Sequence, residues 1–147
     1  MKRILNLLAV CLVFSSASLF AQVDLGNLSS NPYLQDSTSN PYGAGSKYNP
    51  NSINNPYGIY GSKYSNKSAT NPFATDAPKL YDQNGEYKGK LSTNKYDPES
   101  ISNPYGIYGS KYSPKSINNP YGAGSKFKFD SPTNPFGIGL QIIGSDN

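Results

Sequence analysis

The sequence predicts a mainly irregular and β structure: a loop-rich repeat protein of short turn units around one central β-hairpin, with little helix outside an export signal. Three features of the 147 residues lead to this prediction. The chain begins with a short apolar segment, turn-forming residues dominate its composition, and near-identical repeats flank an Asn-Gly turn.

The first 21 residues have the layout of a secretory signal peptide. Two basic residues open the chain, residues 4–14 are apolar, and residues 15–21 are mostly small. The apolar run is shorter than the ~20 residues that span a membrane. We expect cleavage after Ala21, with cleavage after Ala17 as a second choice. The mature protein would then be exported, periplasmic or extracellular, and without a transmembrane segment.

The mature chain would be nearly neutral and rich in turn formers. Removing the signal takes two of the 13 basic residues and none of the 9 acidic ones, so the net charge falls from +4 to +2. Its lysines occur singly, which argues against a nucleic-acid partner. Of the remaining 126 residues, 60 are Gly, Pro, Asn or Ser, while Leu, Ile, Val and Phe number only 19. A conventional aliphatic core is not expected, but 13 Tyr and 4 Phe could join turns into a packed structure.

Repeats of an Asn-Pro-aromatic motif are the main signal in the sequence. Residues 52–72 and 100–120 are identical at 17 of 21 positions, and NPYGAGSK occurs at both 40–47 and 119–126. Such similarity indicates duplication, and each copy would be a local unit that packs against its neighbours. The motif begins at Asn31, Asn40, Asn55, Asn71, Asn103, Asn119 and Asn134.

Each unit is predicted to hold a β-turn, a few extended residues and a single helical turn. Asn-Pro-Tyr-Gly has the residue order of a β-turn. Residues 61–64 and 109–112 would be extended. An Asn, Asp or Ser before Pro would cap a helical turn, which the next Asn-Pro would end. These caps are Asn49, Asp97 and Ser113.

A β-hairpin is predicted at residues 79–92, because two β-capable segments flank Gln83-Asn84-Gly85 and Asn-Gly is a strong hairpin signal. The apolar tail could form a last strand that pairs with this hairpin. The chain thus divides into a signal peptide 1–21, an N-terminal linker 22–39, turn repeats 40–78, the hairpin 79–92, turn repeats 93–137 and a C-terminal apolar tail 138–147.

The signal peptide, the string NPYGIYGSKYSPKSINNPYGAGSK and the central LYDQNGEYKGKLS together resemble small exported bacterial proteins that carry tandem NPYG and YGSxYS units. The resemblance covers residues 31–137. It implies export and a repeat architecture, and it carries over no activity and no functional residue.

Catalytic and metal-binding residue types are scarce. The chain has no His, and its single Cys, Cys11, lies in the export signal, so imidazole and thiol chemistry would be missing. Residues 82–86 resemble part of a calcium loop, but a polar hairpin turn is the favoured interpretation because further ligands do not follow. Asp97 and Glu99 could pair for glycoside chemistry, although a capping role is favoured. No enzyme activity, cofactor or metal is expected.

Tyrosine is the residue type that could form a binding surface. Rigid rings among Asn, Ser and Gly make adaptable contacts, and aromatic faces beside amides suit sugar rings. The same rings could instead form the core of a protein poor in aliphatic residues, and both roles can coexist if some rings are exposed. The candidate ligand-binding residues are Tyr57, Tyr60, Tyr64, Tyr105, Tyr108 and Tyr112.

These observations favour a non-catalytic exported protein of the bacterial cell envelope or extracellular matrix, with a structural or interaction role through its Asn-Pro-Tyr-Gly repeats. The alternative is a carbohydrate- or peptidoglycan-binding module that uses exposed Tyr and Asn side chains. The expected partner is a cell-wall glycan or an envelope protein. A partly ordered chain is expected, with most order in residues 79–92.

Overall fold

The computed structural model describes residues 21–146. The predicted signal peptide lies outside this range except for Ala21, the first residue of β1. Within the range there is no helix, and most residues are irregular, so the predicted mainly irregular and β class is confirmed. The four strands are β1 (Ala21–Leu28), β2 (Lys79–Tyr81), β3 (Tyr87–Lys90) and β4 (Leu140–Asp146).

The strands form one antiparallel sheet in the order β1-β4-β2-β3. β2 and β3 are the predicted hairpin, and the Asp82 carboxylate closes its turn by accepting the backbone N–H groups of Asn84 and Glu86. The tail forms β4, which pairs with β2 as predicted and places Leu80 opposite Ile142. β4 also pairs with β1, a strand within the segment that was expected to be a linker.

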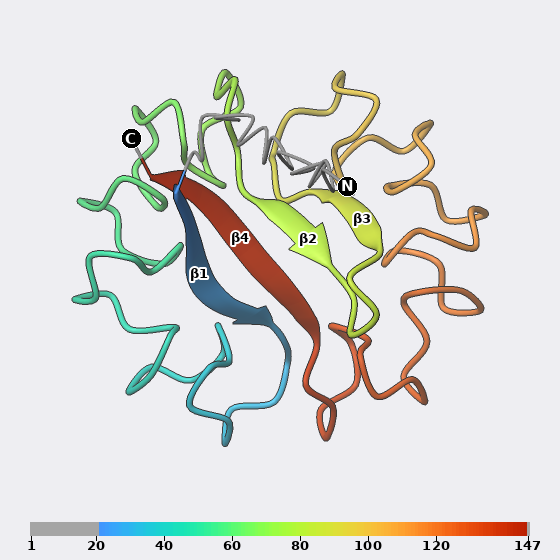
Figure 1. Cartoon of the computed structure of the whole chain (residues 1–147). Coiled ribbons are helices and arrows are strands. Elements are labelled where there is room, and N and C mark those ends of the chain that lie inside the picture. Colours follow the sequence, from blue (N-terminus) through green and yellow to red (C-terminus); the bar gives the residue numbers. More distant parts are fainter. Residues whose placement is uncertain (1–20, 147) are drawn as a thin grey trace, which may run out of the picture.

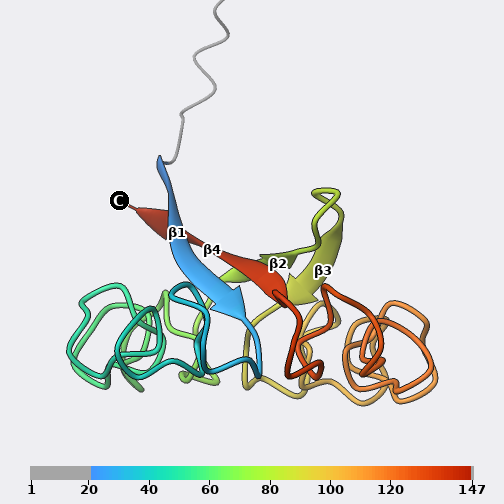
Figure 2. The same cartoon turned by 90° about the horizontal axis from the view of Figure 1, so that it is seen from below.

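Two lobes of turns occupy one face of this sheet. The N-terminal lobe (residues 29–78) and the C-terminal lobe (residues 91–139) surround the strands when viewed onto the sheet (Figure 1). In the perpendicular view, one lobe lies below each end of the sheet, and the other face of the sheet is left uncovered (Figure 2). Antiparallel sheets commonly have one packed and one solvated face.

Each lobe is a chain of β-turns that recur every three residues. From Ser37 to Gly58, the N–H of every third residue donates to the carbonyl oxygen three residues earlier, at 3.0–3.4 Å. A second continuous ladder runs from Ser113 to Gly137. The Asn or Ser at most steps also accepts, through its side chain, the N–H two residues later, as Ser52 Oγ does from Asn54 at 3.0 Å. Each of these residues therefore takes part in two overlapping turns, a backbone β-turn and a turn closed by its own side chain.

The single helical turns predicted at Asn49, Asp97 and Ser113 are wrong, and so are the extended pieces at 61–64 and 109–112. All of them belong to the three-residue turn ladder or its junctions. The caps do bind as caps: Asn49 Oδ1 accepts the N–H of Asn51 at 2.9 Å. No helix follows because a new side-chain acceptor three residues later redirects the backbone before an i to i−4 bond can form.

The two halves of the chain have an approximate two-fold relationship. The strand that begins each half pairs with the strand that ends the other half, so that β1 pairs with β4 and β3 with β2. The centre of this arrangement is the pair Leu80 and Ile142, both fully buried. Each lobe is attached to its own first strand by an equivalent parallel bridge, Asn27 with Ser37 and Lys90 with Ser100.

The lobes also touch each other at both junctions. The N–H of Ser30 donates to the carbonyl oxygen of Pro132 at 3.0 Å, and Thr93 Oγ1 donates to that of Thr70 at 3.3 Å. The start of each lobe is thereby hydrogen-bonded to the end of the other. Each half therefore depends on the other for strand pairing and for the hydrogen bonds at the ends of its lobe.

The core is a thin layer between the sheet and the lobes. Its buried residues are Leu25, Tyr60, Ala69, Leu80, Leu91, Leu140 and Ile142. Inside the lobes, buried serines take the place of aliphatic side chains, and several donate to backbone carbonyl oxygens, as Ser100 Oγ does to Ser92 O at 3.1 Å. Buried hydroxyl groups are tolerated when they are hydrogen-bonded in this way. The fully buried serines of the lobes are Ser37, Ser52, Ser68, Ser100, Ser116 and Ser131.

Candidate functional site

The lobes carry a dense set of exposed aromatic side chains. Within residues 21–146, twelve Tyr and Phe side chains of the lobes are 84–96% exposed to solvent. Each lobe contributes six, two in each repeat of 15 or 16 residues. Isolated exposed apolar residues are ordinary, whereas these rings recur at equivalent positions of both lobes. The residues are Tyr33, Tyr42, Tyr48, Tyr57, Tyr64, Phe73, Tyr96, Tyr105, Tyr112, Tyr121, Phe127 and Phe136.

One local device positions all twelve rings. Each aromatic residue is the second residue after an Asn or Ser whose side-chain oxygen accepts the N–H of the aromatic residue, at 2.9–3.3 Å. The intervening residue is Pro or Lys. The backbone under each ring is therefore fixed by the turn, while the ring itself is free of protein contacts that would bury it.

The asparagine of the Asn-Pro-aromatic motif is an additional anchor. Asn55 Nδ2 donates to the carbonyl oxygen of Asn49, six residues earlier, at 3.1 Å. The same bond forms at Asn40, Asn71, Asn103, Asn119 and Asn134. Asn31 differs, because its Nδ2 reaches Gly137 at the end of the other lobe, at 3.4 Å. These asparagines are mostly buried and serve the fold, so they are not available to a ligand in the way that the alternative function assumed.

Four of the six predicted site residues are on the surface. Tyr57, Tyr64, Tyr105 and Tyr112 belong to the exposed array, at 90–95% exposure. Tyr60 and Tyr108 do not. Each follows Ile in the sequence GIYG, which is one residue longer than the GAG of the other repeats. The extra residue lengthens that turn of the ladder and directs the tyrosine side chain inward.

Tyr60 is a core residue, only 1% exposed, and its hydroxyl donates to the carbonyl oxygen of Ser145 in β4 at 2.9 Å. Burial raises its pKa, as do the negative charges of Asp146 and Asp76. Tyr108 lies over Gly89 in β3, and its ring meets Tyr87 edge-on with centroids 5.3 Å apart. Both tyrosines join a lobe to the sheet and are therefore removed from the list of surface binding residues.

Sequence reasoning missed eight of the twelve exposed rings as site residues. The signal that identifies them is the pattern Asn or Ser, then Pro or Lys, then Tyr or Phe. It includes Tyr33 and Tyr96, which lie in segments that lack the longer repeated strings. A tyrosine that follows Ile inside the pattern GIYG is excluded by the same rule.

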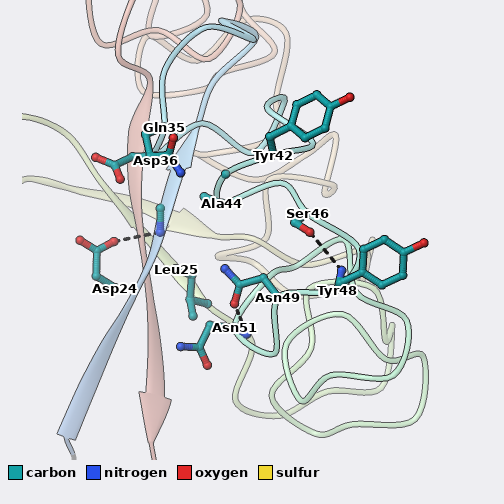
Figure 3. Close-up of a pocket in the computed structure, with 12 residues that line it drawn as sticks. Asp24, Leu25, Gln35, Asp36, Tyr42, Ala44, Ser46, Tyr48, Asn49 and Asn51 are labelled. Carbon is teal, nitrogen blue, oxygen red and sulfur yellow. Dashed lines mark hydrogen bonds between the residues drawn. The ribbon is translucent and has the colours of Figure 1, made fainter.

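A hollow of about 630 Å³ lies where the N-terminal lobe meets β1 (Figure 3). Tyr42 and Tyr48 both extend away from β1 on one side of it. The rest of its lining mixes apolar side chains, Leu25 and Ala44, with amide side chains and the carboxylates of Asp24 and Asp36. Aromatic rings beside amide and carboxylate groups provide stacking surfaces and hydrogen-bond acceptors for a polyhydroxyl ligand.

The hollow lies beside a GAG turn, which is one residue shorter than the GIYG turns. Ala44 of the turn GAG lies against Gly26 of β1, and Tyr108 occupies the corresponding place against Gly89 of β3. Gly26 and Gly89 both have positive φ, 95° and 99°, in otherwise extended strands. The smaller Ala44 side chain fills less of the space between its turn and its strand than the Tyr108 ring does.

The carboxylates considered for catalysis are used in ion pairs. Lys90 Nζ lies 3.2 Å from both the Asp97 and the Glu99 carboxylates. Burial alone would raise the pKa of Asp97, but the N–H of Glu99 and the Lys90 ammonium outweigh it and lower that pKa. A lowered pKa favours the charged form and does not suit a general acid at neutral pH. Among residues 21–146, no three His, Cys, Asp or Glu side chains are grouped as metal ligands.

Comparisons with protein-family models, with curated proteins and with solved structures find no match to this chain. The class of protein is thus defined by the fold and the surface alone: a two-lobed turn-repeat protein whose described residues, 21–146, form no helix and carry a regular aromatic array. The part of the chain that the structure describes contains no helix long and apolar enough to cross a membrane.

Proposed function

We propose that this protein is a non-catalytic exported protein of the bacterial cell envelope or extracellular matrix, in which the two turn lobes are scaffolds that present aromatic rings to a partner. The observation that supports it is the array of twelve exposed rings on fixed turns. Folding leaves these large side chains in water, so the array is costly for solubility and is accounted for by contacts with another molecule.

Two further observations support an interaction role over catalysis. The two carboxylates considered for catalysis, Asp97 and Glu99, are both paired with Lys90. The repeated placement of one ring type on many equivalent turns suits a partner that is itself extended or repetitive, because several weak contacts then add up.

A second candidate function is carbohydrate or peptidoglycan binding. The hollow beside Tyr42 and Tyr48 favours it, because its lining combines these two residues with amide and carboxylate groups. The binding groups in this interpretation are the rings and the exposed amides such as Asn51, and not the buried asparagines of the Asn-Pro motifs.

The test is retention of the mature chain, residues 22–147, on isolated cell-envelope material. A variant with Tyr42, Tyr48, Tyr57 and Tyr64 changed to Ser removes exposed rings from the N-terminal lobe only. The matched variant changes Tyr105, Tyr112, Tyr121 and Phe127 to Ser in the other lobe. Unfolding by urea checks that both variants stay folded.

We expect retention to fall strongly in at least one of the two variants. Protease treatment of the material then separates a protein partner, whose loss abolishes retention, from a glycan, whose soluble fragments compete for it. Unchanged retention in both variants would refute the proposed role of the rings.

A further inference from the structure

A groove of about 650 Å³ runs along the C-terminal lobe and is lined by three lysines. Lys95, Lys111 and Lys126 occupy equivalent positions in successive repeats, 16 and 15 residues apart. All three are exposed, and none forms an ion pair within residues 21–146. No Asp or Glu is among the residues that line the groove. The lysines are thus the charged groups of a groove whose lining also includes apolar side chains such as Ile117 and Pro120.

Hydrogen bonds join the consecutive turns that line the groove. Asn118 Nδ2 donates to the carbonyl oxygens of Ile101 and Gly109, at 2.9 and 3.0 Å. Thr133 Oγ1 donates to Gly124 O at 2.6 Å, which ties the next turn in the same way. Because these bonds hold consecutive turns together, the spacing of the three lysines along the groove is set by the fold and not by flexible loops.

Each lysine of the groove directly precedes an exposed aromatic residue. Tyr96, Tyr112 and Phe127 follow the three lysines and are at least nine-tenths exposed. Every repeat of this lobe therefore offers one ammonium group and one ring at adjacent positions. That combination suits a linear polymer whose units are rings and which carries negative charges at regular intervals.

The N-terminal lobe lacks one member of this row of lysines. Lys47 and Lys63 stand at the equivalent positions of two of its repeats, but Pro32 takes the place that corresponds to Lys95. The turns of the N-terminal lobe are joined by the same bonds, since Asn54 Nδ2 donates to Thr38 O and Gly45 O and Thr70 Oγ1 donates to Gly61 O, so the missing third lysine is the difference in charge between the two faces. The two lobes therefore provide a matched comparison within one chain.

We propose that the lysine groove binds a linear polysaccharide that carries carboxylate groups, such as a polyuronate. This inference rests on the second candidate function and names its ligand class. A nucleic acid is disfavoured because residues 22–147 carry a net charge of only +2 and their lysines do not form a basic run, whereas nucleic-acid-binding surfaces are strongly basic.

The experiment measures binding of the mature chain to soluble alginate, a linear polyuronate, and to carboxyl-reduced alginate, which keeps the sugar chain without its charge. The groove variant is Lys111→Gln with Lys126→Gln. The control variant is Lys47→Gln with Lys63→Gln, which removes the same charge from equivalent turns of the other lobe. Urea unfolding confirms that both variants are folded.

We expect the groove variant to bind alginate about ten-fold more weakly, as for the loss of two exposed ion pairs, and the control variant to bind within about two-fold of the parent. Binding should weaken with added salt and should be far weaker for the carboxyl-reduced polymer.

Equal affinity for the two polymers, or equal losses in the two variants, would overturn the groove assignment. If alginate binding does not depend on the lysines but is lost when exposed rings are changed to Ser, the carbohydrate-binding function stands and the lysine groove is not its site. Tighter binding of a single-stranded oligonucleotide than of alginate would replace the polysaccharide with a nucleic acid. Failure of both polymers to bind would refute the polysaccharide inference itself, while retention on envelope protein would still support the scaffold function.

Discussion

The Tyr60 hydroxyl donates a hydrogen bond to the carbonyl oxygen of Ser145, 2.9 Å away. Tyr60 comes from a lengthened turn of the N-terminal lobe, and Ser145 lies near the end of β4, the last strand of the other half. The bond therefore connects the first lobe to the strand that completes the sheet. The turn that holds Tyr60, GIYG, is one residue longer than the GAG turns, and its tyrosine is a core residue.

Tyr60→Phe is expected to lower the free energy of unfolding by about 1 kcal/mol, because it leaves the Ser145 carbonyl without this partner. Tyr60→Ala should cost about 3–5 kcal/mol, because it also leaves a cavity in the core. Urea unfolding measures both. The control is Tyr57→Ala, at an exposed ring, which should change stability by no more than about 0.5 kcal/mol.

Tyr87→Phe should have the opposite outcome. The Tyr87 hydroxyl is buried and has no hydrogen-bond partner among residues 21–146, while its ring packs against Tyr81 and Tyr108. Removing an unsatisfied buried hydroxyl keeps the ring contacts and is neutral or stabilising, by up to about 1 kcal/mol. A loss of stability as large as that of Tyr60→Phe would contradict this account of the site.

Gly89→Ala should destabilise the protein more than Gly85→Ala. Both glycines have positive φ, so either substitution carries a backbone penalty of about 1–2 kcal/mol. A Cβ at Gly89 would also lie 2.7 Å from the Tyr108 Cβ, whereas a Cβ at Gly85 would meet open space. Overpacking adds about 1–3 kcal/mol at Gly89 alone. Equal effects in urea unfolding would show that Tyr108 does not pack on β3.

Asn55→Ala should lower the free energy of unfolding by about 1–3 kcal/mol, because its side chain joins two backbone groups, Tyr57 N–H and Asn49 C=O. The matched control is Asn51→Ala, in the adjacent turn, where the side chain is exposed. That variant should stay within about 0.5 kcal/mol of the parent. The same difference should recur at Asn119, which makes the same two bonds in the other lobe.

Stability should fall in alkali because two buried tyrosines hold their protons tightly. Burial, followed by the nearby negative charges, raises the pKa of Tyr60 and of Tyr87 above the ordinary value of 10.0. The folded state binds these protons more strongly than the unfolded chain does. Their contribution is therefore fully present below about pH 10 and is lost progressively as the pH rises above it.

The measurement is urea unfolding at about pH 8 and about pH 11. The double variant Tyr60→Phe with Tyr87→Phe should lose less stability between these two conditions than the parent, because it has no phenol to ionise at either site. An unchanged pH dependence would assign the alkaline loss to other groups.

The hairpin and the last strand were predictable because their signals are local. Asn84-Gly85 specifies a turn, and the alternation in β3 places Gly89 on the packed face and Lys88 and Lys90 on the opposite face of the sheet. β1 was not predictable, since its eight residues AQVDLGNL contain a glycine and few aliphatic side chains, and its order depends on pairing with β4 at the opposite end of the chain. The predicted helical turns do not form because each capping residue is followed, three residues later, by another side chain that accepts a backbone N–H.

The sequence by itself determined the turn repeats, the lack of histidine, and the rule that places an aromatic residue two positions after Asn or Ser. These features depend on side chains bonding to the backbone within a few residues. Only the tertiary structure decided which tyrosines are exposed, how β1 and β4 close the sheet across the two halves, and that Lys95, Lys111 and Lys126 share one groove. Those outcomes depend on contacts between residues far apart in the chain, which a local pattern does not encode.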